Sequence, residues 1–289
     1  MSADPVPRGP AENAQLALLL EVAGTPKPGN VDRHRDLEDL RFEQFLAGAV
    51  GAGKGLELAE SGDPVGTAFE RAVAGMAGQE GGNTQFGCLL LLVPLVRAAS
   101  DGDLSREGVR AVVEATTVED AVGFYRAFDR VDVAVGEPPE DAAALDVRRG
   151  TAAAPTLRER ELTLLDVMAL SAEPREDHPG DGNAREWVDG FPRTFAAAER
   201  ILADDGPVTD RAARAFLSLL AQEPDTLVAV DRGLDVAYEV MERAGSIDDD
   251  LDAAEALADE FVHRGINPGT TADLTCAALF VALERGLSV

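Results

Sequence analysis

Four short segments of this chain carry the residues whose types and spacing could do chemistry. Residues 25–36, 81–87, 223–226 and 265–273 each combine Gly or Pro with Asn, Asp or Thr, close to the start of a helical pattern. Backbone N–H groups at a helix N-terminus attract phosphate, and Mg²⁺ binds carboxylates together with phosphate oxygens. If the four segments converge, they predict a polar cleft with two or three carboxylates and one lysine, suited to a magnesium nucleotide polyphosphate.

The first segment, TPKPGNVDRHRD at residues 25–36, is a stiff loop. Its two prolines fix their own φ angles and push the residue before each of them toward extended backbone. Lys27 lies between them, and it is one of only two lysines among the 26 basic residues of the chain. A stiff loop holds polar groups in place at little ordering cost, so Lys27, Asp32 and Arg33 are candidates for ligand binding. The alternative is a proline-rich linker after a helix.

The second segment is glycine-rich and leads into the most apolar run of the chain. Asn83 or Thr84 can cap the helix that follows, and residues 86–95 are apolar on all sides, which predicts a helix at the centre of the protein. The unpaired N–H groups and the positive dipole end of such a helix suit an anion such as phosphate. The alternative is a capped core helix without a ligand.

The other two segments each place a carboxylate at the start of a helix. Asp225 follows Pro224, and Asp273 follows a turn made rigid by Pro268 and its neighbouring glycines. A carboxylate in the first turn complements the helix dipole by a few tenths to about 1 kcal/mol. For Asp225 that structural role would be sufficient without any chemistry.

The elements that must position these segments are predicted to be helices throughout. Apolar residues recur at helical spacing along most of the chain, and no stretch alternates with a period of two. We therefore predict an all-α protein of roughly ten to twelve helices, with a disordered N-terminus at residues 1–10, one domain at residues 11–289 and a surface excursion near residues 132–160. Two long helices are expected at residues 183–204, kinked at Pro192, and at residues 225–243.

The composition is strongly acidic and limits the partners of the protein. The chain has 53 acidic and 26 basic residues, a net charge of −27 that is spread along its whole length. Such a surface repels nucleic acids and anionic membranes. Scarce lysine with abundant Asp and Glu indicates adaptation to a high-salt cytosol, where screening shortens the range of self-repulsion. A GC-rich genome would also favour Arg over Lys, but it does not explain the charge.

Several other patterns argue against export, a membrane span, a phosphate-binding loop and a metal site. The chain starts without a signal-peptide pattern and its longest apolar run has nine residues, too short to cross a bilayer, so a cytoplasmic protein is expected. A near match to the phosphate-binding loop GxxxxGK[ST] begins at Gly48, but Gly55 stands where Ser or Thr would bind magnesium. Cys88 and Cys276 lie in apolar helical patterns and are expected as buried thiols. The histidines lack the spacing of a zinc site.

Four motifs resemble, in order, those of the triphosphoribosyl-dephospho-CoA synthase family, which is all-α. The resemblance implies a transferase in which the 2′-hydroxyl of the adenosine ribose of 3′-dephospho-CoA attacks C1′ of the ribose of ATP. Adenine leaves and the triphosphate stays attached. Such a reaction needs a base near the hydroxyl, a proton or hydrogen bond for the purine, and cations for the triphosphate. The motifs are KPGNVDR at 27–33, GGNTQFG at 81–87, EPDTLVAVDRG at 223–233 and INPGTTADL at 266–274.

The resemblance also implies roles for individual residues. Lys27 and Arg33 would contact phosphate, and Asp32 would bind Mg²⁺ or act as the base. Asp225 and Asp273 would be further acid-base carboxylates, with Asp225 also a candidate magnesium ligand. The nucleotide site would be completed by a set of small and polar residues: Gly29, Asn83, Thr84, Thr226 and Asn267.

One position departs from the family pattern. Members from citrate-lyase systems carry Asn-Thr-His-Lys-Gly at the second motif, whereas Gln85 and Phe86 replace the His-Lys pair here. This change weakens a phosphate contact or indicates a different substrate, so another ribosyl-accepting alcohol is a second candidate beside 3′-dephospho-CoA. His34 could supply the missing basic group, although a lone histidine in an acidic loop is more often solvated. The alternative function is a non-catalytic helical protein that binds a nucleotide or a partner.

Overall fold

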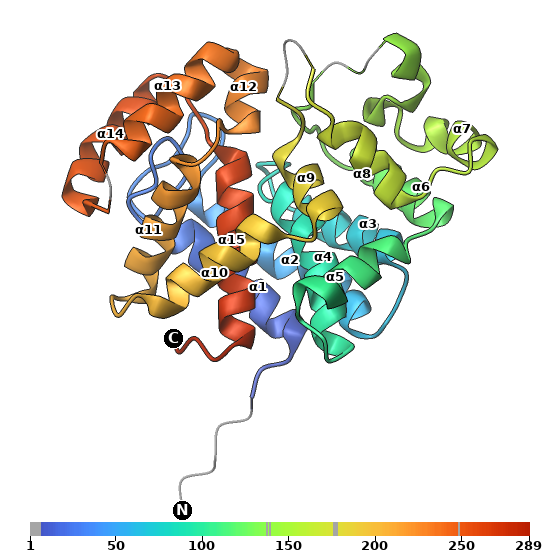
Figure 1. Ribbon diagram of the computed structural model, residues 1–289, viewed down its shortest axis with the longest axis horizontal. Coiled ribbons are helices and arrows are strands. Elements are labelled where there is room, and N and C mark those ends of the chain that lie inside the picture. The colour runs from blue at the N-terminus through green and yellow to red at the C-terminus, as the bar shows by residue number, and fades with distance from the viewer. Residues whose placement is uncertain (1–6, 137, 139, 176–178, 248) are drawn as a thin grey trace, which may run out of the picture.

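The computed structural model describes residues 7–136, 138, 140–175, 179–247 and 249–289 (Figure 1). Within these ranges the chain forms fifteen α-helices and two short 3-10 helices, and it contains no strand. The all-α prediction is confirmed, with more helices than the ten to twelve expected.

The helices of the first half of the chain are α1 (Pro10–Ala23), α2 (Phe42–Glu60), α3 (Val65–Met76), α4 (Phe86–Ser100), α5 (Arg106–Glu114), α6 (Val118–Phe128), η1 (Glu140–Leu145), η2 (Val147–Ala153) and α7 (Ala154–Glu159). Those of the second half are α8 (Leu164–Ala172), α9 (Gly182–Asp189), α10 (Pro192–Ala203), α11 (Val208–Leu220), α12 (Thr226–Arg232), α13 (Leu234–Gly245), α14 (Leu251–His263) and α15 (Gly269–Glu284).

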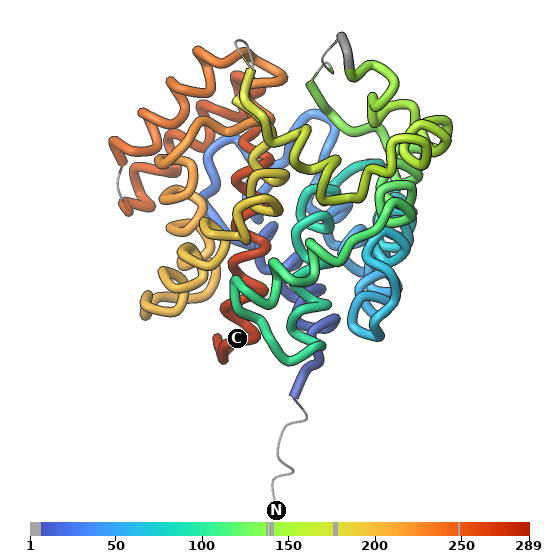
Figure 2. Tube along the Cα trace, turned by 45° about the vertical axis from the view of Figure 1, so that its right-hand side comes forward, coloured from blue at the N-terminus to red at the C-terminus, as the bar shows by residue number. Residues whose placement is uncertain are grey.

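Two apolar helices form the centre of the molecule. The helix predicted from the run at residues 86–95 is α4, and all but a few of its side chains are buried. The last helix, α15, is buried from Thr270 to Leu283 apart from Asp273, and it packs against α1, α4, α10 and α11. Cys276, Ala277 and Ala278 are small, which lets these neighbours approach closely. Figures 1 and 2 show α15 running through the middle of the fold, beside α1.

The remaining helices form two groups on either side of this centre. In Figure 2, α11 to α14 lie on one side, and α2, α3 and α5 to α8 lie on the other. The first group has an apolar cluster of its own that includes Phe216, Val228 and Phe261. The second group shares the main core with α1, α4 and α15. The start of α15 and the turn before it therefore lie where the two groups meet.

Two predicted long helices are each broken into two. The helix expected at residues 183–204 is interrupted between α9 and α10, because Gly190 and Phe191 both adopt left-handed backbone with φ values of 74° and 58°. The helix expected at residues 225–243 is interrupted by Gly233, whose φ of 93° separates α12 from α13. Positive φ is readily accessible to glycine and ends a helix there.

Residues 140–159 fold onto α6 as η1, η2 and α7, with Ala153 and Leu157 buried. Residues 1–6, most of the N-terminus predicted to be disordered, lie outside the described residues. The assignment of residues 11–289 to one domain stays a prediction. Among the described helices, none combines the length and the apolar character that a membrane-spanning segment needs.

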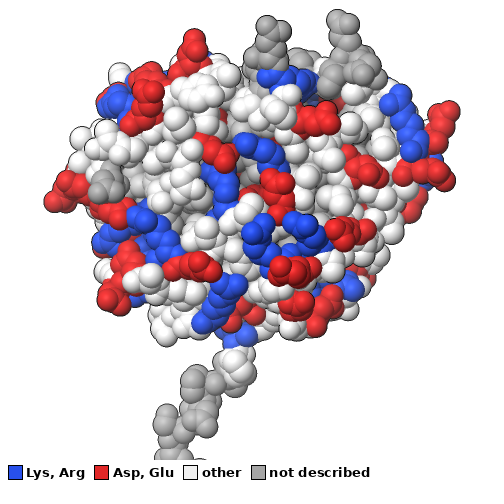
Figure 3. Space-filling view, in the orientation of Figure 1, with Lys and Arg blue, Asp and Glu red and all other residues white. Residues whose placement is uncertain are grey.

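The charged side chains on the face shown in Figure 3 are intermingled. Arginines lie beside carboxylates, in agreement with ion pairs such as Arg264 with Glu239 and Arg243 with Glu260. A continuous basic surface is not seen on this face.

Candidate functional site

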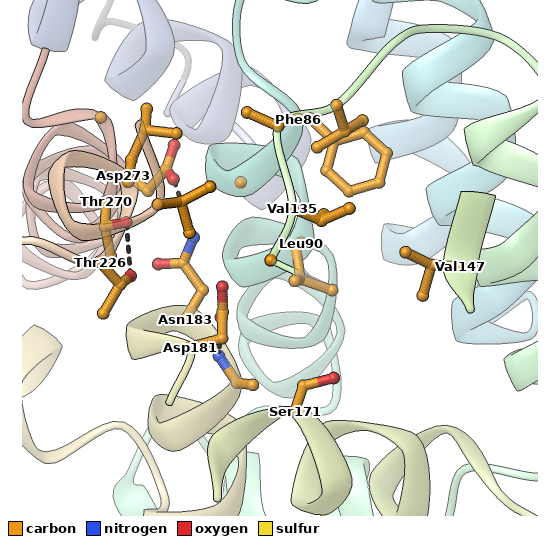
Figure 4. Close-up of a pocket in the computed structure, with 18 of the residues that line it drawn as sticks. Phe86, Leu90, Val135, Val147, Ser171, Asp181, Asn183, Thr226, Thr270 and Asp273 are labelled. Carbon is orange, nitrogen blue, oxygen red and sulfur yellow. Dashed lines mark hydrogen bonds between the residues drawn. The ribbon is translucent and has the colours of Figure 1, made fainter. Parts of the chain in front are cut away.

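A cavity of about 460 Å³ lies between the two groups of helices, at the start of α15. It is lined by residues of α1, α4, α6, α8, α9, α12 and α15 and of the segment 132–147. Its two sides differ in character. We call one side the polar wall (Glu21, Asn30, Asn83, Thr84, Asn183, Thr226, Thr270 and Asp273) and the other the apolar wall (Phe86, Leu90, Phe124, Phe128, Val133, Val135, Val147, Val167 and Met168); Figure 4 shows members of both.

The first predicted segment meets the fourth directly. The side-chain nitrogen of Asn30 donates a hydrogen bond of 2.9 Å to the Asn267 side-chain oxygen. Gly29 has a φ of 79°, and a Cβ atom there would overlap the carbonyl oxygen of Ile266. Only glycine lets the two loops pass this closely. The stiff loop is thus fixed against the turn that precedes α15.

The third segment is joined to α15 by the Asp225 carboxylate. One of its oxygens accepts hydrogen bonds from the backbone N–H groups of Leu227 and Val228, at 3.0 and 3.1 Å. The other accepts from both the N–H and the hydroxyl of Thr271, each at 2.7 Å. Burial raises the pKa of Asp225, and these donors oppose the rise. Asp225 is therefore the N-cap of α12 and joins this helix to α15, in keeping with the structural role that the sequence allowed for it.

The second segment is joined to α15 by Asp273. The side-chain nitrogen of Asn183 donates to one Asp273 oxygen at 2.8 Å, and the Cys88 thiol donates to the other at 3.2 Å. A Cβ atom on Gly87 would overlap the Asp273 carboxylate, so glycine at the start of α4 makes room for it. Burial raises the pKa of Asp273 to about 7, against the effect of the two donors and with a smaller contribution from the negative charges of Glu21 and Asp225.

Asp273 is the one predicted carboxylate that faces the cavity. Its side chain is partly exposed, and the exposed part lies on the polar wall. Figure 4 shows it beside Asn183, with the pair formed by the Thr226 and Thr270 hydroxyls, 2.9 Å apart, next to them. A carboxyl group with a pKa near neutrality can exchange a proton with a bound substrate at physiological pH.

Lys27 lies behind the polar wall. It is fully buried, forms an ion pair with Glu21 of α1 and donates to the Asn30 side-chain oxygen at 2.9 Å. Burial raises the pKa of Glu21, and the charge of Lys27 opposes the rise. The positive charge expected to contact phosphate is therefore already paired with a carboxylate.

Asp32 is buried within its own loop. It accepts hydrogen bonds from the Thr25 hydroxyl at 2.9 Å, the Lys27 N–H at 3.1 Å, the Arg35 guanidinium at 3.1 Å and the His34 N–H at 2.8 Å. Both of its oxygens accept hydrogen bonds from the loop, and it does not line the cavity. The neighbouring Arg33 is exposed and lies outside the cavity as well.

The structure therefore brings half of the predicted residues to the cavity. Asn83, Thr84, Thr226, Asn267 and Asp273 line it, whereas Lys27, Gly29, Asp32, Arg33 and Asp225 support it from behind or lie apart. The binding and catalytic roles of both sets stay predictions.

Sequence reasoning missed four residues of the polar wall, of which Thr270 lies within the fourth motif. Glu21 could have been noticed, because it is a charged residue in an otherwise apolar run of the first helix, between Leu20 and Val22. Asn30 lay within the first segment but was not singled out. Asn183 had no signal of its own. Its side-chain oxygen is buried and has no hydrogen-bond partner among the described residues, and the same holds for the Thr84 hydroxyl. Both atoms are shielded from solvent, so they are unsatisfied polar atoms next to the cavity.

The donor set of the cavity fits a hard cation. Its carboxylates include Glu21, Asp181, Asp231 and Asp273, and oxygen ligands are those that Mg²⁺ prefers. The described residues contain no group of three His, Cys, Asp or Glu side chains able to hold a metal by themselves. Mg²⁺ commonly uses only one or two carboxylates and takes its remaining ligands from phosphate and water. The predicted ligands Asp32 and Asp225 have their oxygens already engaged.

Comparison with known proteins gives two matches. The profile of the ATP:dephospho-CoA triphosphoribosyl transferase family matches residues 7–288. The fold is similar to the crystal structure of a candidate triphosphoribosyl-dephospho-CoA synthase from Archaeoglobus fulgidus, with a TM-score of 0.66 and 26% identity over 83% of this chain and 99% of that one. None of the curated protein sequences gives a significant match.

Proposed function

Because the chain belongs to the ATP:dephospho-CoA triphosphoribosyl transferase family, we propose that it transfers the triphosphoribosyl group of ATP to the hydroxyl of 3′-dephospho-CoA or of another alcohol. The observation that carries the proposal is the meeting of all four motif segments at the start of α15, around one cavity. Because ATP is the donor, we expect the reaction to take place in the cytoplasm. The acidic composition suits work in concentrated salt.

Asp273 is the general base of the proposed reaction. A bond forms between the acceptor oxygen and C1′ of the ATP ribose, and the bond from C1′ to adenine breaks. The proton of the acceptor hydroxyl passes to Asp273, the departing adenine takes up a proton from water, and Asp273 then returns its proton to water, so charge and atoms balance. Asn183 and Cys88 hold the carboxylate in place through their hydrogen bonds. Asp225 and Asp32 act as positioning residues, since each fixes a loop that shapes the polar wall.

Mg²⁺ is expected to accompany ATP and to neutralise the triphosphate. Asp181 and Asp231 line the cavity and would hold it together with phosphate oxygens. Lys27 does not replace the metal, because its charge is paired with Glu21.

Release of free adenine tests the proposal. The protein is incubated in high salt with MgATP and 3′-dephospho-CoA or a second alcohol, adenine is measured by chromatography, and the ribosylated acceptor is identified by mass spectrometry. We expect both products in equal amounts. Binding of ATP without adenine release would instead support the non-catalytic alternative.

A further inference from the structure

The first turns of three helices, α4, α9 and α15, meet at the polar wall of the cavity. A Cβ atom on Gly87 of α4 would overlap the Asp273 carboxylate of α15 and would lie 2.6 Å from the side-chain nitrogen of Asn183 in α9. The same Asn183 nitrogen donates to Asp273, and the Cys88 thiol of α4 donates to it as well. The three helix N-termini are therefore in direct contact around one point.

Four backbone N–H groups in these turns have no hydrogen-bond partner among the described residues. The first N–H groups of a helix find no acceptor within the helix, so each needs a cap or a ligand. Some are capped here, since Thr271 donates to Asp225 and Ala184 donates to Asp181. The N–H groups left without an acceptor belong to residues that line the cavity: Gly87, Cys88, Asn183 and Thr270. Together with the positive ends of three helix dipoles, these groups favour an anion.

The Asn183 side chain is independent evidence that a ligand occupies this place. It is only 7% exposed, and its oxygen has no hydrogen-bond partner within the part of the chain that the structure describes. A buried polar atom without a partner is costly, and in folded proteins it marks a place that a water, an ion or a ligand fills. Figure 4 shows this oxygen on the side of the Thr226–Thr270 pair, next to the start of α15.

The chemistry of the surroundings favours a phosphate that is accompanied by magnesium. Among the described lining residues Arg175 alone has a basic side chain, so a phosphate in the cavity depends on backbone N–H groups and on the metal. Asp181, proposed above to hold Mg²⁺, is the N-cap of α9 and lies next to the unpaired N–H of Asn183. A carboxylate for the metal and N–H donors for the phosphate oxygens therefore stand side by side.

We propose that the first turns of α4, α9 and α15 form one subsite that binds the polyphosphate of a nucleotide substrate through four backbone N–H groups, those of Gly87, Cys88, Asn183 and Thr270. The triphosphate of ATP and the diphosphate of 3′-dephospho-CoA share this chemistry. The inference rests on the transferase function proposed above and names the groups that hold its substrate. It includes α9, which none of the four motifs covers.

The first test measures binding without catalysis. Inorganic triphosphate is titrated into the protein in the presence of MgCl₂ by isothermal titration calorimetry, and ATP or 3′-dephospho-CoA is then added alone as a competitor. We expect inorganic triphosphate to bind and one of the two nucleotides to displace it, which identifies the substrate whose polyphosphate the subsite takes. Displacement by neither nucleotide, or no binding of inorganic triphosphate, would overturn the inference. Displacement without adenine release in the complete assay would support the subsite and overturn the transferase function.

The second test removes one N–H group of the subsite. Proline lacks the N–H but is compatible with the first turn of a helix, and Gly269 before it has no Cβ to clash with the ring. Thr270→Pro is compared with Thr270→Val, because both lose the hydroxyl that contacts Thr226 and only valine keeps the N–H. A hydrogen bond to a charged group contributes about tenfold or more to affinity. We therefore expect the Kd for inorganic triphosphate, with MgCl₂ present, to be at least tenfold higher for Thr270→Pro.

Equal Kd values for the two variants would overturn the inference, provided that circular dichroism shows both to be folded as the wild type. If Thr270→Pro does not fold, the displacement test on the unaltered protein decides.

Discussion

Asp225 and Asp273 look alike in sequence, yet their surroundings are opposite. Asp225 is the N-cap of α12, whereas Asp273 lies just beyond the first turn of the neighbouring helix α15 and not within it as expected. Asp225 is buried and accepts four hydrogen bonds, three of them from backbone N–H groups. Asp273 accepts two side-chain hydrogen bonds and faces the cavity. A carboxylate with all its lone pairs engaged holds the backbone, whereas one with spare capacity at a cavity wall is available for proton transfer. Asp32 resembles Asp225 in this respect, because it is buried and also accepts four hydrogen bonds.

The largest expected effect is on the reaction rate of Asp273→Asn. Removing a general base typically lowers the rate by about 10²- to 10⁴-fold, and we expect a loss of kcat in that range, measured by adenine release. The fold should be retained, because the Asn183 amide can turn and accept a hydrogen bond from the new side-chain nitrogen through its unpartnered oxygen. A variant with more than a tenth of the wild-type kcat would remove Asp273 from the proposed chemistry.

The same replacement at Asp225 should act on stability instead. Asp225→Asn places an amide nitrogen where an oxygen accepts from the backbone N–H of Leu227 or Thr271, so buried donors lose their partner. We expect the free energy of unfolding to fall by about 2 to 4 kcal/mol. Denaturant titration of both variants in high salt measures the difference. Equal stabilities of Asp225→Asn and Asp273→Asn would show that the number of hydrogen bonds does not distinguish a structural carboxylate from a catalytic one.

Much of the fold and part of the site could be predicted, because the signals are local. The apolar run of α4 is visible within ten residues of sequence, although the N-cap of this helix is Gln85 and not Asn83 or Thr84. The breaks at Gly190 and Gly233 were missed, since the apolar pattern continues through both glycines and only the backbone conformation ends the helices.

The composition of the polar wall depends on which helix faces meet, and local patterns do not contain that information. Glu21 and Asn183 come from α1 and α9, and neither lies in a motif. The sequence also does not indicate that Lys27 forms an ion pair with Glu21. A lysine in a stiff loop was therefore predicted to bind a ligand, whereas it is paired with a carboxylate behind the polar wall.

Gly87 allows the position of Asp273 to be tested without changing the carboxylate. In Gly87→Ala the new methyl group would overlap the Asp273 carboxylate and displace it. Misplacing a catalytic group can lower the rate about 100-fold, and overpacking a core costs about 1 to 3 kcal/mol of stability. We expect kcat to fall about 10- to 100-fold. Gly245→Ala is the matched control, because a Cβ atom on that exposed helical glycine meets nothing closer than 3.8 Å. Equal activity of the two variants would contradict the placement of Asp273.

The pH dependence of the reaction should report the pKa of Asp273. Burial holds this pKa at about 7, far above the ordinary aspartate value of 3.8, so the carboxyl is protonated and unable to act as a base below neutrality. We expect kcat/KM to rise about tenfold per pH unit up to pH 7 and then to level off. The raised pKa also means that the folded state holds a proton that the unfolded state releases between pH 4 and 7. The contribution of Asp273 to stability therefore declines as pH rises through that window. A rate profile that is flat from pH 5 to 8 would rule out this group as the base.

The smallest effect should come from the thiol that touches Asp273. The hydrogen bond from Cys88 favours the ionised carboxylate and lowers its pKa, so Cys88→Ala should move the inflection of the kcat/KM profile to higher pH by less than one unit. Cys88→Ser is the matched variant, because its hydroxyl can donate in place of the thiol, and we expect its inflection to stay near that of the wild type. The loss of one hydrogen bond would have less effect on the pKa of Asp225, because three others would remain. Finding the inflection of the alanine variant at or below the wild-type pH would show that the thiol does not contact the base.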